Sequence, residues 1–364
     1  MHIGIVLHPF GDSSKGLEQY IYETTNAILT SGNGDVDFTV FVKGDPDTSS
    51  LPSHVRVVNL PKAFFWNLAL LPWYKKCDAF VFFTESAPLF LWKKSIIVFF
   101  DAAYFYFGSQ TVYGRIQRKV LVWWRKCMMQ SARHVVVISQ ASKDDLVDHF
   151  SIKPEQVTVI YPGFKTFDAS SEVVAQTTAK PFFMYVGPMK ERKNVFRIVE
   201  AYIAFRQSTN FTHELYLVGR KTKGDYEEKV MTLISGSEYK DSILLKTNVD
   251  DEELKSLYAT TTALVYPSLL EGFGLPILEA LNYGAVAITS STTSTREVLG
   301  DAGLLVDPHY PQEIAEAMKQ IAEGTYDREA FKKSAAEQCA RFSWEKSGEE
   351  WSTLFSNDAI QKAS

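Results

Sequence analysis

Cysteine is scarce in this chain. The only three, Cys77, Cys127 and Cys339, are odd in number, widely separated and without CxxC spacing. The sequence therefore predicts neither a disulfide framework nor a zinc site.

The chain also lacks a surplus of basic residues, since the formal net charge is -5. A protein that neutralises phosphates along a duplex needs such a surplus, so we expect no nucleic-acid partner.

Long apolar runs are missing as well. The run Ile96 to Phe100 is bounded by Lys93, Lys94 and Asp101, well short of the roughly 20 residues that span a bilayer. The first residues, His2 to Leu7, resemble a strand and lack the charged start, apolar core and cleavage site of a secretory signal. We therefore expect a cytoplasmic protein without a transmembrane segment.

Metal-binding patterns are weak. Asp35 with Asp37, and Asp45 with Asp47, have Asp-x-Asp spacing, but one pair enters a strand from a glycine-rich turn and the other lies in a loop rich in proline and serine. The seven histidines show no ligand spacing. The sequence predicts no metal and no bound cofactor.

What is present is an alternation of short β-branched or aromatic runs with helical patterns. Alternation of this kind predicts parallel sheets joined by crossover helices, and 364 residues suffice for two cores. The expected strands of the first half are 38–42, 79–83, 96–100, 135–138 and 157–161, after the initial 2–7. Those of the second half are 182–186, 214–218, 243–246, 263–266 and 286–289.

Between the two halves lies a stretch rich in serine, threonine and alanine without apolar periodicity, which indicates a connection. We therefore predict an α/β protein with two Rossmann-like domains. The predicted boundaries are 1–165 for the first domain, 166–180 for the linker, 181–342 for the second domain and 343–364 for a terminal helix, which either crosses back to the first domain or packs on its own domain.

Two glutamates, Glu271 and Glu279, lie eight residues apart in a segment whose pattern predicts a strand, then a glycine loop, then a helix. Glu271 precedes the glycines of the loop, and Glu279 lies in the first part of the helix. Gly272 and Gly274 permit a tight turn, and Pro276 suits the first turn of a helix. The free N–H groups of such a helix start favour a phosphate, and carboxylates on either side accept hydrogen bonds from sugar hydroxyls. The segment predicts a sugar-nucleotide site, while helix capping by the two glutamates is the plainer alternative.

This segment, continued through residues 282–290, 296–298 and 303–308, resembles the family 4 retaining glycosyltransferases. The resemblance implies the GT-B fold, two Rossmann-like domains with parallel sheets facing across a cleft that holds the active site. It implies that Glu271 orients the donor sugar and Glu279 binds the ribose hydroxyls. It also implies donor contacts from the loop backbone at Gly272, Phe273, Gly274 and Leu275.

A second block, residues 185–194, resembles the family element that brings cations to the donor diphosphate, and the resemblance implies donor contacts from Gly187, Arg192 and Lys193. Arg192 and Lys193 precede an apolar-periodic helix over 195–205, and cations at a helix start are unfavourable unless an anion lies nearby. Solvated surface charge is the alternative. Pro188 follows Gly187, where relatives carry arginine, so phosphate neutralisation rests on Arg192 and Lys193.

The first glycine loop, residues 8–16, does not match the GxGxxG of dinucleotide-binding enzymes. In the family two adjacent glycines lie here over the donor phosphates, and the matching pair is Lys15 and Gly16. Gly16 permits close backbone approach. Lys15 either adds charge near the diphosphate or points to solvent.

One departure from the family concerns proton chemistry. Many relatives carry His-Asp after the strand at 96–100, whereas this chain has Phe100 and Asp101. Phe100 offers a backbone carbonyl but no imidazole. His8 is a weak substitute, and Asp101 has either a catalytic role in the cleft or a capping role in the turn that follows.

Aromatic residues crowd the first domain, interleaved with lysine and arginine. Between Tyr113 and Met129, four apolar residues, Ile116, Val120, Trp123 and Trp124, share one helical face with cations around it. Three interpretations fit: a saccharide-stacking groove, a basic aromatic face resting on anionic lipid, or an ordinary amphipathic core helix.

The resemblance thus implies metal-independent, retaining transfer of a hexose in surface polysaccharide synthesis. The donor is a nucleotide diphosphate sugar, UDP favoured over GDP, and the acceptor a saccharide or lipid-linked saccharide. Glu271, Lys193, Arg192 and Asp101 are the catalytic candidates. The predicted location is the cytoplasm, with peripheral contact at the inner face of the cytoplasmic membrane. The alternatives are a sugar-nucleotide-binding protein without transferase activity, which Phe100 motivates, and a nucleotide-sugar epimerase.

Overall fold

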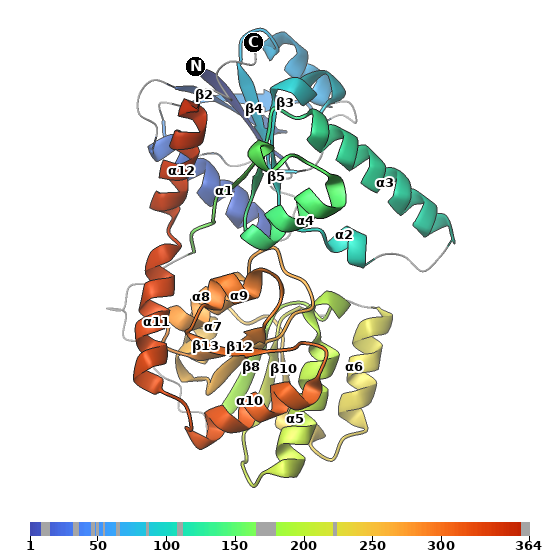
Figure 1. Cartoon of the computed structure of the whole chain (residues 1–364), viewed down its shortest axis with the longest axis vertical. Coiled ribbons are helices and arrows are strands. Elements are labelled where there is room, and N and C mark those ends of the chain that lie inside the picture. Colours follow the sequence, from blue (N-terminus) through green and yellow to red (C-terminus); the bar gives the residue numbers. More distant parts are fainter. Residues whose placement is uncertain are drawn as a thin grey trace. The chain divides into compact units, whose positions relative to one another are not determined.

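A computed structural model describes residues 1–8, 15–31, 36–44, 48, 51–53, 55–62, 66–84, 87–107, 112–164, 180–220 and 224–357. The chain divides into two compact units, residues 1–163 with 342–364, and residues 164–341 (Figure 1). The division falls within two residues of the predicted boundaries at 165 and 342. The predicted linker, except Lys180, and the Asp-x-Asp residues Asp35, Asp45 and Asp47 lie outside the described residues.

The first unit contains a parallel seven-stranded sheet in the order β3-β2-β1-β4-β5-β6-β7. Its strands are β1 (His2–Leu7), β2 (Asp37–Lys43), β3 (Arg56–Leu60), β4 (Ala79–Phe82), β5 (Ser95–Phe99), β6 (His134–Val137) and β7 (Val157–Val159). Its helices are α1 (Lys15–Thr30), α2 (Ala103–Tyr106), α3 (Val112–Ser131), α4 (Gln140–Phe150) and α12 (Trp344–Ser356), with 3-10 turns η1 (Trp66–Trp73), η2 (Leu89–Lys94) and η3 (Pro154–Gln156).

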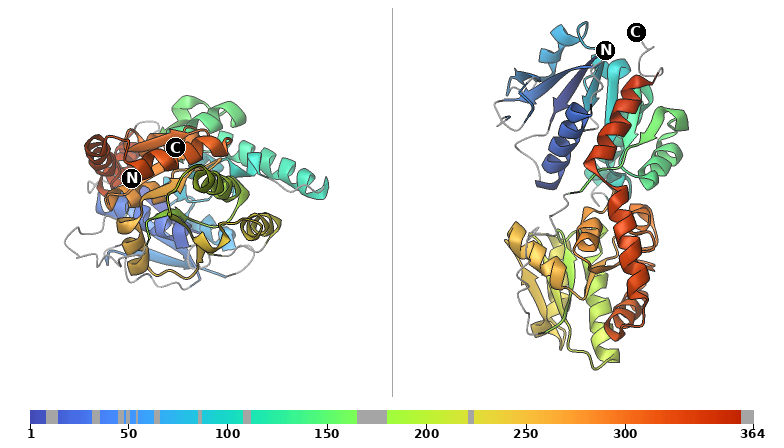
Figure 2. Two further views of the ribbon diagram at one scale, coloured as in Figure 1. Left: turned by 90° about the horizontal axis from the view of Figure 1, so that it is seen from below. Right: turned by 90° about the vertical axis from the view of Figure 1, so that its left-hand side faces the viewer.

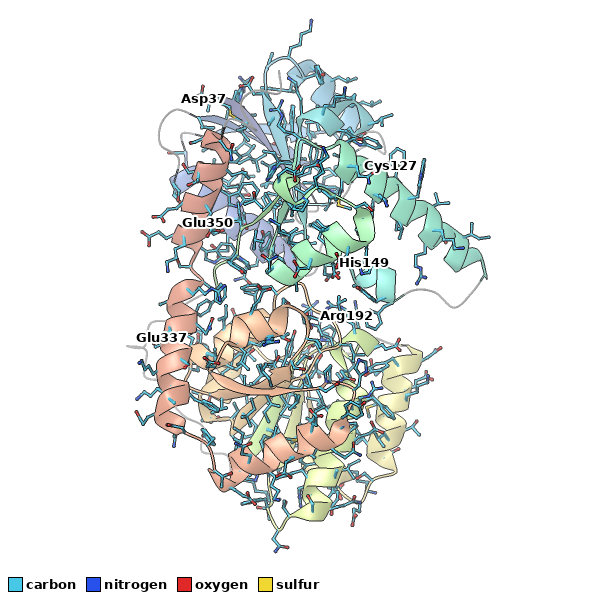
Figure 3. The ribbon with its side chains drawn as sticks, viewed as in Figure 1. Asp37, Cys127, His149, Arg192, Glu337 and Glu350 are labelled. Carbon is cyan, nitrogen blue, oxygen red and sulfur yellow. The ribbon has the colours of Figure 1, made fainter. Side chains whose placement is uncertain are left out.

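The central strands explain why this sheet needs helices on both faces. Every residue of β4, β5 and β6 is buried, and these strands are continuous runs of valine, isoleucine and phenylalanine with little polar alternation. Such strands are stable only where both sheet faces are covered. Figure 2 shows helices on either side of the sheet in each unit, and Figure 3 shows the side chains that fill the space between these layers.

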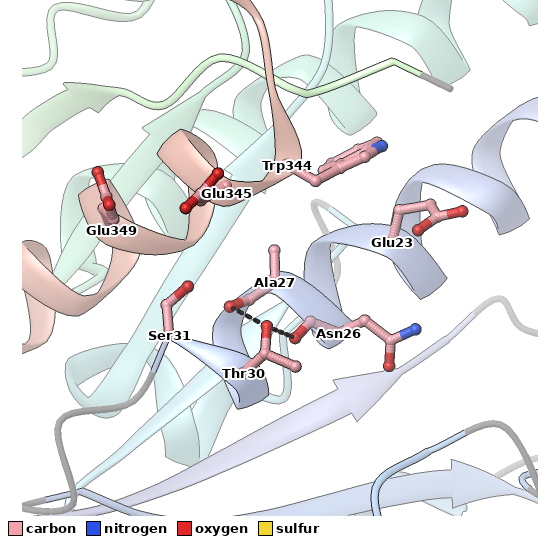
Figure 4. A pocket seen from close by; sticks show the side chains of 8 residues that line it. All are labelled: Glu23, Asn26, Ala27, Thr30, Ser31, Trp344, Glu345 and Glu349. Atoms are coloured by element: carbon pink, nitrogen blue, oxygen red, sulfur yellow. Dashed lines mark hydrogen bonds between the residues drawn. The ribbon is translucent and has the colours of Figure 1, made fainter. Parts of the chain in front are cut away.

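The terminal helix α12 packs against α1 within the first unit. Ser343 caps α12 by accepting a hydrogen bond from the Lys346 N–H at 3.2 Å, and Trp344 meets the Tyr20 ring edge-on at 6.0 Å. Gly348 permits this close packing, because a Cβ there would lie 2.2 Å from the Ser31 hydroxyl oxygen that follows α1. The two helices also line a cavity of about 600 Å³, whose lining includes Glu23, Glu345 and Glu349 (Figure 4).

The second unit contains a parallel six-stranded sheet in the order β10-β9-β8-β11-β12-β13. Its strands are β8 (Phe182–Val186), β9 (Glu214–Val218), β10 (Ile243–Lys246), β11 (Ala263–Tyr266), β12 (Val286–Ser290) and β13 (Gly303–Val306). Its helices are α5 (Val195–Ser208), α6 (Asp225–Ser235), α7 (Asp251–Thr260), α8 (Leu275–Asn282), α9 (Thr293–Leu299), α10 (Pro311–Glu323) and α11 (Arg328–Arg341), with η4 (Glu191–Lys193) and η5 (Lys240–Ser242).

The order of this sheet places a switch point between β8 and β11. From β8 the chain continues outward to β9 and β10, then returns to the other side of β8 as β11. Loops that leave neighbouring strands in opposite directions diverge and leave room for a ligand at the carboxyl ends of those strands. The loop after β8 carries Arg192 and Lys193, and the loop after β11 carries Glu271.

All eleven predicted strands are present within two residues of their predicted bounds, but β3 and β13 were not predicted. Both are edge strands that are only partly buried. In β3, Arg56 and Asn59 interrupt the apolar run, so its sequence shows neither a continuous apolar stretch nor a clear alternation. β13 is apolar, but its run of Leu304 to Val306 is too short to distinguish a strand from a loop.

Candidate active site

The loops after β8 and β11 are joined by backbone and side-chain hydrogen bonds. The Leu269 N–H donates to the Arg192 carbonyl at 2.8 Å. Asn194, buried and in the left-handed conformation with φ of 61°, donates through its amide to the carbonyls of Pro267 at 3.0 Å and Pro308 at 2.7 Å. One side chain therefore joins the loops that follow β8, β11 and β13, and asparagine tolerates this backbone conformation better than most residues.

The side chains of these loops form an ion-paired cluster, which we call the Arg192–Lys193–Glu271 triad. Lys193 Nζ lies 2.6 Å from Glu271 Oε1, and an Arg192 guanidinium nitrogen lies 3.1 Å from Glu271 Oε2. The Glu271 and Lys193 side chains are 6% and 9% exposed, and that of Arg192, labelled in Figure 3, is 25% exposed. Two cations around one carboxylate leave a net charge of +1, which favours an anionic ligand.

Lys193 is held from a second side by Tyr266, the last residue of β11. Its ammonium donates to the Tyr266 hydroxyl and lies 4.8 Å from the centre of the Tyr266 ring. Burial, with a smaller contribution from Glu271, raises the pKa of Tyr266 well above its ordinary value. The phenol therefore stays neutral. Because Lys193 is buried, surface solvation does not explain its charge.

The charge state of Glu271 follows from two opposing effects. Burial by itself raises the pKa of this carboxyl group, but Lys193 and then Arg192 stabilise the carboxylate and bring the pKa below its ordinary value. The triad therefore remains ionised at neutral pH. Arg192 is its most exposed member and is the cation best placed to meet a ligand, with Lys193 held behind it.

The glycine loop between Glu271 and α8 is fixed by one serine. The buried Ser294 hydroxyl lies 2.9 Å from the carbonyl oxygens of Glu271 and Phe273 and donates to them. Gly274 has φ of 120°, a conformation that residues with a Cβ rarely adopt. It is the N-cap of α8 and supplies no side-chain acceptor, so the cap itself leaves the first N–H groups of α8 to other partners.

Glu279 lies one turn into α8 and contacts α7 instead of the triad. The Tyr258 hydroxyl donates to Glu279 Oε2 at 2.8 Å. Burial raises the pKa of Glu279, the hydrogen bond from Tyr258 lowers it, and Asp251 raises it further. The net direction is upward, opposite to that of Glu271.

We expect Glu279→Gln to raise the Tm at pH 7.5 and, on the ribose contact that the family resemblance implies for Glu279, to weaken donor binding. The folded state raises the pKa of Glu279, so ionisation destabilises the fold above that pKa, and a neutral amide removes this penalty. The Tm gain is a few °C at most, the shift that about 1 kcal/mol produces, and it disappears below the ordinary pKa of about 4.3. Loss of one charge-assisted hydrogen bond lowers donor affinity roughly tenfold.

Thermal unfolding at pH 7.5 and pH 4, with ligand titrations, measures both effects. Glu253→Gln is the control, since that half-buried glutamate pairs with Lys246 at 3.2 Å in the same unit. A lower Tm for Glu279→Gln at pH 7.5 contradicts the prediction.

The remaining predicted residues lie in other parts of the structure. The Asp101 Oδ1 atom accepts the Ala103 N–H at 2.9 Å, the contact expected of the capping alternative. The Phe100 carbonyl accepts the Ser142 hydroxyl at 3.0 Å, and its ring packs edge-on against Tyr20 at 4.9 Å. Both of these Phe100 contacts lie inside the first unit.

Two predicted glycines and one lysine concern the phosphate loops. Gly187 follows β8 with φ of 145° and donates its N–H to the Val218 carbonyl at 2.8 Å. Lys15 and Gly16 form the start of α1. Most of the loop before them, residues 9–14, and the Lys15 side chain lie outside what the structure describes.

Sequence reasoning assigned no role to several residues that shape the site: Tyr185, Asn194, Tyr258, Tyr266 and Ser294. Tyr185 and Tyr266 stack with ring centres 6.1 Å apart at the ends of β8 and β11. A signal existed for both, since each is a polar-tipped residue at the end of a predicted strand beside a recognised motif. Ser294 and Tyr258 lie outside those motifs and had no such signal.

Comparison with known proteins identifies the fold and the family of this chain. The fold is GT-B: Anabaena Alr3699/HepE in complex with UDP and glucose superimposes with a TM-score of 0.75, at 16% identity over 98% of this chain and 99% of that one. Two family models match consecutive stretches, Glycosyltransferase Family 4 over residues 14–166 and Glycosyl transferases group 1 over residues 167–338. The chain belongs to the family 4 glycosyltransferases.

Curated relatives are more similar in sequence, but they match this chain over only part of their length. O-antigen chain mannosyltransferase B of Escherichia coli is 29% identical over 230 residues, 60% of this chain and 58% of the relative. O-antigen chain mannosyltransferase RfbU of Salmonella typhimurium is 28% identical over 234 residues, 64% of this chain and 62% of the relative. The matches thus span about three fifths of these relatives.

Proposed function

We propose that this protein transfers a hexose from a nucleotide diphosphate sugar to a saccharide or lipid-linked saccharide acceptor in surface polysaccharide synthesis. The observation that carries the proposal is the Arg192–Lys193–Glu271 triad at the switch point of the second sheet. Its net positive charge, beside a glycine loop and a helix start, suits a diphosphate with an attached sugar. The names of the relatives support polysaccharide synthesis, with mannose as the first hexose to test.

The proposed reaction retains the anomeric configuration and needs no metal. The bond from the anomeric carbon to the diphosphate oxygen breaks, and a bond to the acceptor oxygen forms on the same face of the sugar. The leaving phosphate takes the acceptor proton, so no protein nucleophile or imidazole is required, which accommodates Phe100. Arg192, Lys193 and the loop backbone at Gly274 and Leu275 stabilise the charge that develops on the diphosphate.

The triad suggests how donor and protein exchange partners. The N–H groups of Arg192 and Lys193 that hold Glu271 are the groups that a diphosphate would bind. When these donors turn to phosphate oxygens, the Glu271 carboxylate becomes available to sugar hydroxyls. Glu271 thereby links occupancy of the phosphate position to recognition of the sugar.

A donor panel tests the proposal. Ligands that bind only the folded state raise the Tm according to concentration and affinity, by about 2.7 kcal/mol at 100 times Kd. UDP, GDP and their glucose, galactose and mannose derivatives are compared, with EDTA to test metal independence. We favour UDP over GDP as the nucleotide of the donor. The similarity to HepE concerns the fold alone, so the donor panel decides between the two nucleotides. If none of these ligands raises the Tm, the proposal is wrong.

A second candidate function is sugar-nucleotide binding without transfer. Phe100 in the usual histidine position and Asp101 in a backbone turn favour it. Stabilisation by a donor without release of nucleoside diphosphate, with or without an acceptor, indicates this alternative. Conversion of the donor to an isomeric sugar nucleotide without acceptor indicates an epimerase.

We also propose that the protein works at the inner face of the cytoplasmic membrane, where a lipid-linked acceptor is found. Within the described residues, no helix combines the length and apolar character needed to cross a bilayer. A location at the membrane therefore requires a surface that binds lipid from one side.

A further inference from the structure

Helix α3 presents its apolar stripe to solvent. Ile116, Val120 and Trp123 are 57%, 59% and 62% exposed, and the neighbouring Trp124 is 41% exposed. Figures 1 and 2 show α3 extending away from the sheet of its own unit. The buried residues Met128 and Met129, at the other end of the helix, attach it to the core. The core-helix interpretation of this stripe is therefore wrong.

Two 3-10 turns continue the apolar surface. Trp92 of η2 contacts Trp124 edge-on at 5.1 Å, and Leu89 of η2 is 63% exposed. Phe90 of η2 lines a shallow cavity of about 520 Å³ together with Leu71 and Tyr74. Leu68 and Leu71 of η1 are each half exposed. We call this region, which consists of Leu68, Leu71, Leu89, Ile116, Val120, Trp123 and Trp124, the α3–η surface.

The segments that form the α3–η surface carry charge of one sign. The three segments 66–76, 89–94 and 112–131 contain nine lysines and arginines and no acidic residue, in a chain whose net charge is -5. Lys75, Lys76, Lys93 and Lys119 are exposed. Cations gathered at an exposed apolar face attract an anionic partner and oppose pairing with a second copy of the same face.

We propose that the α3–η surface docks on an anionic lipid bilayer. Tryptophan prefers the boundary between headgroups and acyl chains, and a helix with an apolar stripe and basic flanks lies in the plane of that boundary. Each lysine or arginine near an anionic leaflet strengthens the attraction. The inference deepens the proposed membrane location and rests on it. It is independent of the triad, which lies in the other unit.

Vesicle co-sedimentation of the full chain tests the proposal without donor or acceptor. Vesicles of phosphatidylcholine with about 30% phosphatidylglycerol are compared with pure phosphatidylcholine, at about 0.05 and 0.5 M NaCl. The test variant is Ile116→Ser/Val120→Ser/Trp123→Ser, whose positions are exposed and whose fold is checked by circular dichroism and Tm. Tyr310→Ser is the matched control, because Tyr310 is 57% exposed on the other unit.

We expect binding to the anionic vesicles that weakens in high salt, and partitioning at least about tenfold lower for the triple variant than for wild type and Tyr310→Ser. A Lys93→Glu/Lys119→Glu variant is expected to bind weakly even at low salt. The proposal is overturned if wild type and the triple variant bind the vesicles equally well, or if neither binds. A concentration-dependent dimer lost in the triple variant without vesicle binding also overturns it. The donor panel is unaffected by either result, so failure here is distinguishable from failure of the transferase proposal.

Discussion

Replacing Glu271 by glutamine is expected to lower the rate of glycosyl transfer by about 10²–10³-fold without lowering affinity for the free nucleoside diphosphate. The amide keeps the shape of the carboxylate but cannot balance two cations or accept strong hydrogen bonds from sugar hydroxyls. Misplacement of the reacting groups by about 1 Å is enough for a loss of about 10²-fold. Under the proposed function, Arg192 and Lys193, freed from their carboxylate, are expected to hold phosphate oxygens as in wild type.

The two parts of this prediction are measured separately. Steady-state transfer gives kcat and KM, and calorimetry compares UDP or GDP with the corresponding sugar nucleotide. The affinity for the sugar nucleotide should fall, while the affinity for the free nucleoside diphosphate should stay the same. Glu253→Gln, which changes a partly exposed ion pair in the same unit, should behave as wild type. Transfer within a few-fold of wild type, or an equal loss of affinity for nucleotide and sugar nucleotide, contradicts the role given to Glu271.

Replacing Lys193 by methionine is expected to destabilise the second unit by about 2–3 kcal/mol at neutral pH and to abolish donor-induced stabilisation. A buried carboxylate left with no partner costs roughly 3–5 kcal/mol, and Arg192 at 3.1 Å reduces that cost here. The matched control is Lys246→Met, because Lys246 and Glu253 form a pair whose side chains are 31% and 38% exposed. Loss of such a surface pair costs about 1 kcal/mol or less.

The pH dependence of this effect has a definite sign. In wild type the folded pKa of Glu271 lies below its ordinary value, so the triad stabilises the fold above pH about 4.3 and this contribution is lost as pH falls through the folded pKa. In Lys193→Met one of the two cations that oppose the effect of burial is gone. The stability difference between variant and wild type should therefore shrink as pH falls.

Denaturant unfolding followed at pH 7 and pH 4 measures this difference, and Lys193→Met/Glu271→Gln completes the cycle. Removing both charges of the pair should recover part of the stability at pH 7, since the buried carboxylate is gone. A cost for Lys193→Met no larger than that for Lys246→Met would mean that the triad is not the buried ion pair described here.

Sequence patterns determined much of the fold because they report the solvent that each segment meets. Continuous apolar runs predict strands covered on both faces, and all eleven strands predicted in this way were found. The edge strand β3 escaped prediction because its exposed positions carry polar residues that interrupt the apolar run, and β13 because its apolar run is very short. The glycine loop and the cations after β8 were also visible in the sequence, because their chemistry depends on residue type and local spacing.

Only the tertiary structure decided which of these groups meet. Arg192 and Glu271 are 79 positions apart, and no local rule brings them within 3.1 Å. The crossover from β10 back to β11 does so, because it sets the loop after β11 beside the loop after β8. The stripe on α3 shows the same limit: helical periodicity identifies an apolar face, but exposure depends on what the rest of the fold places against it.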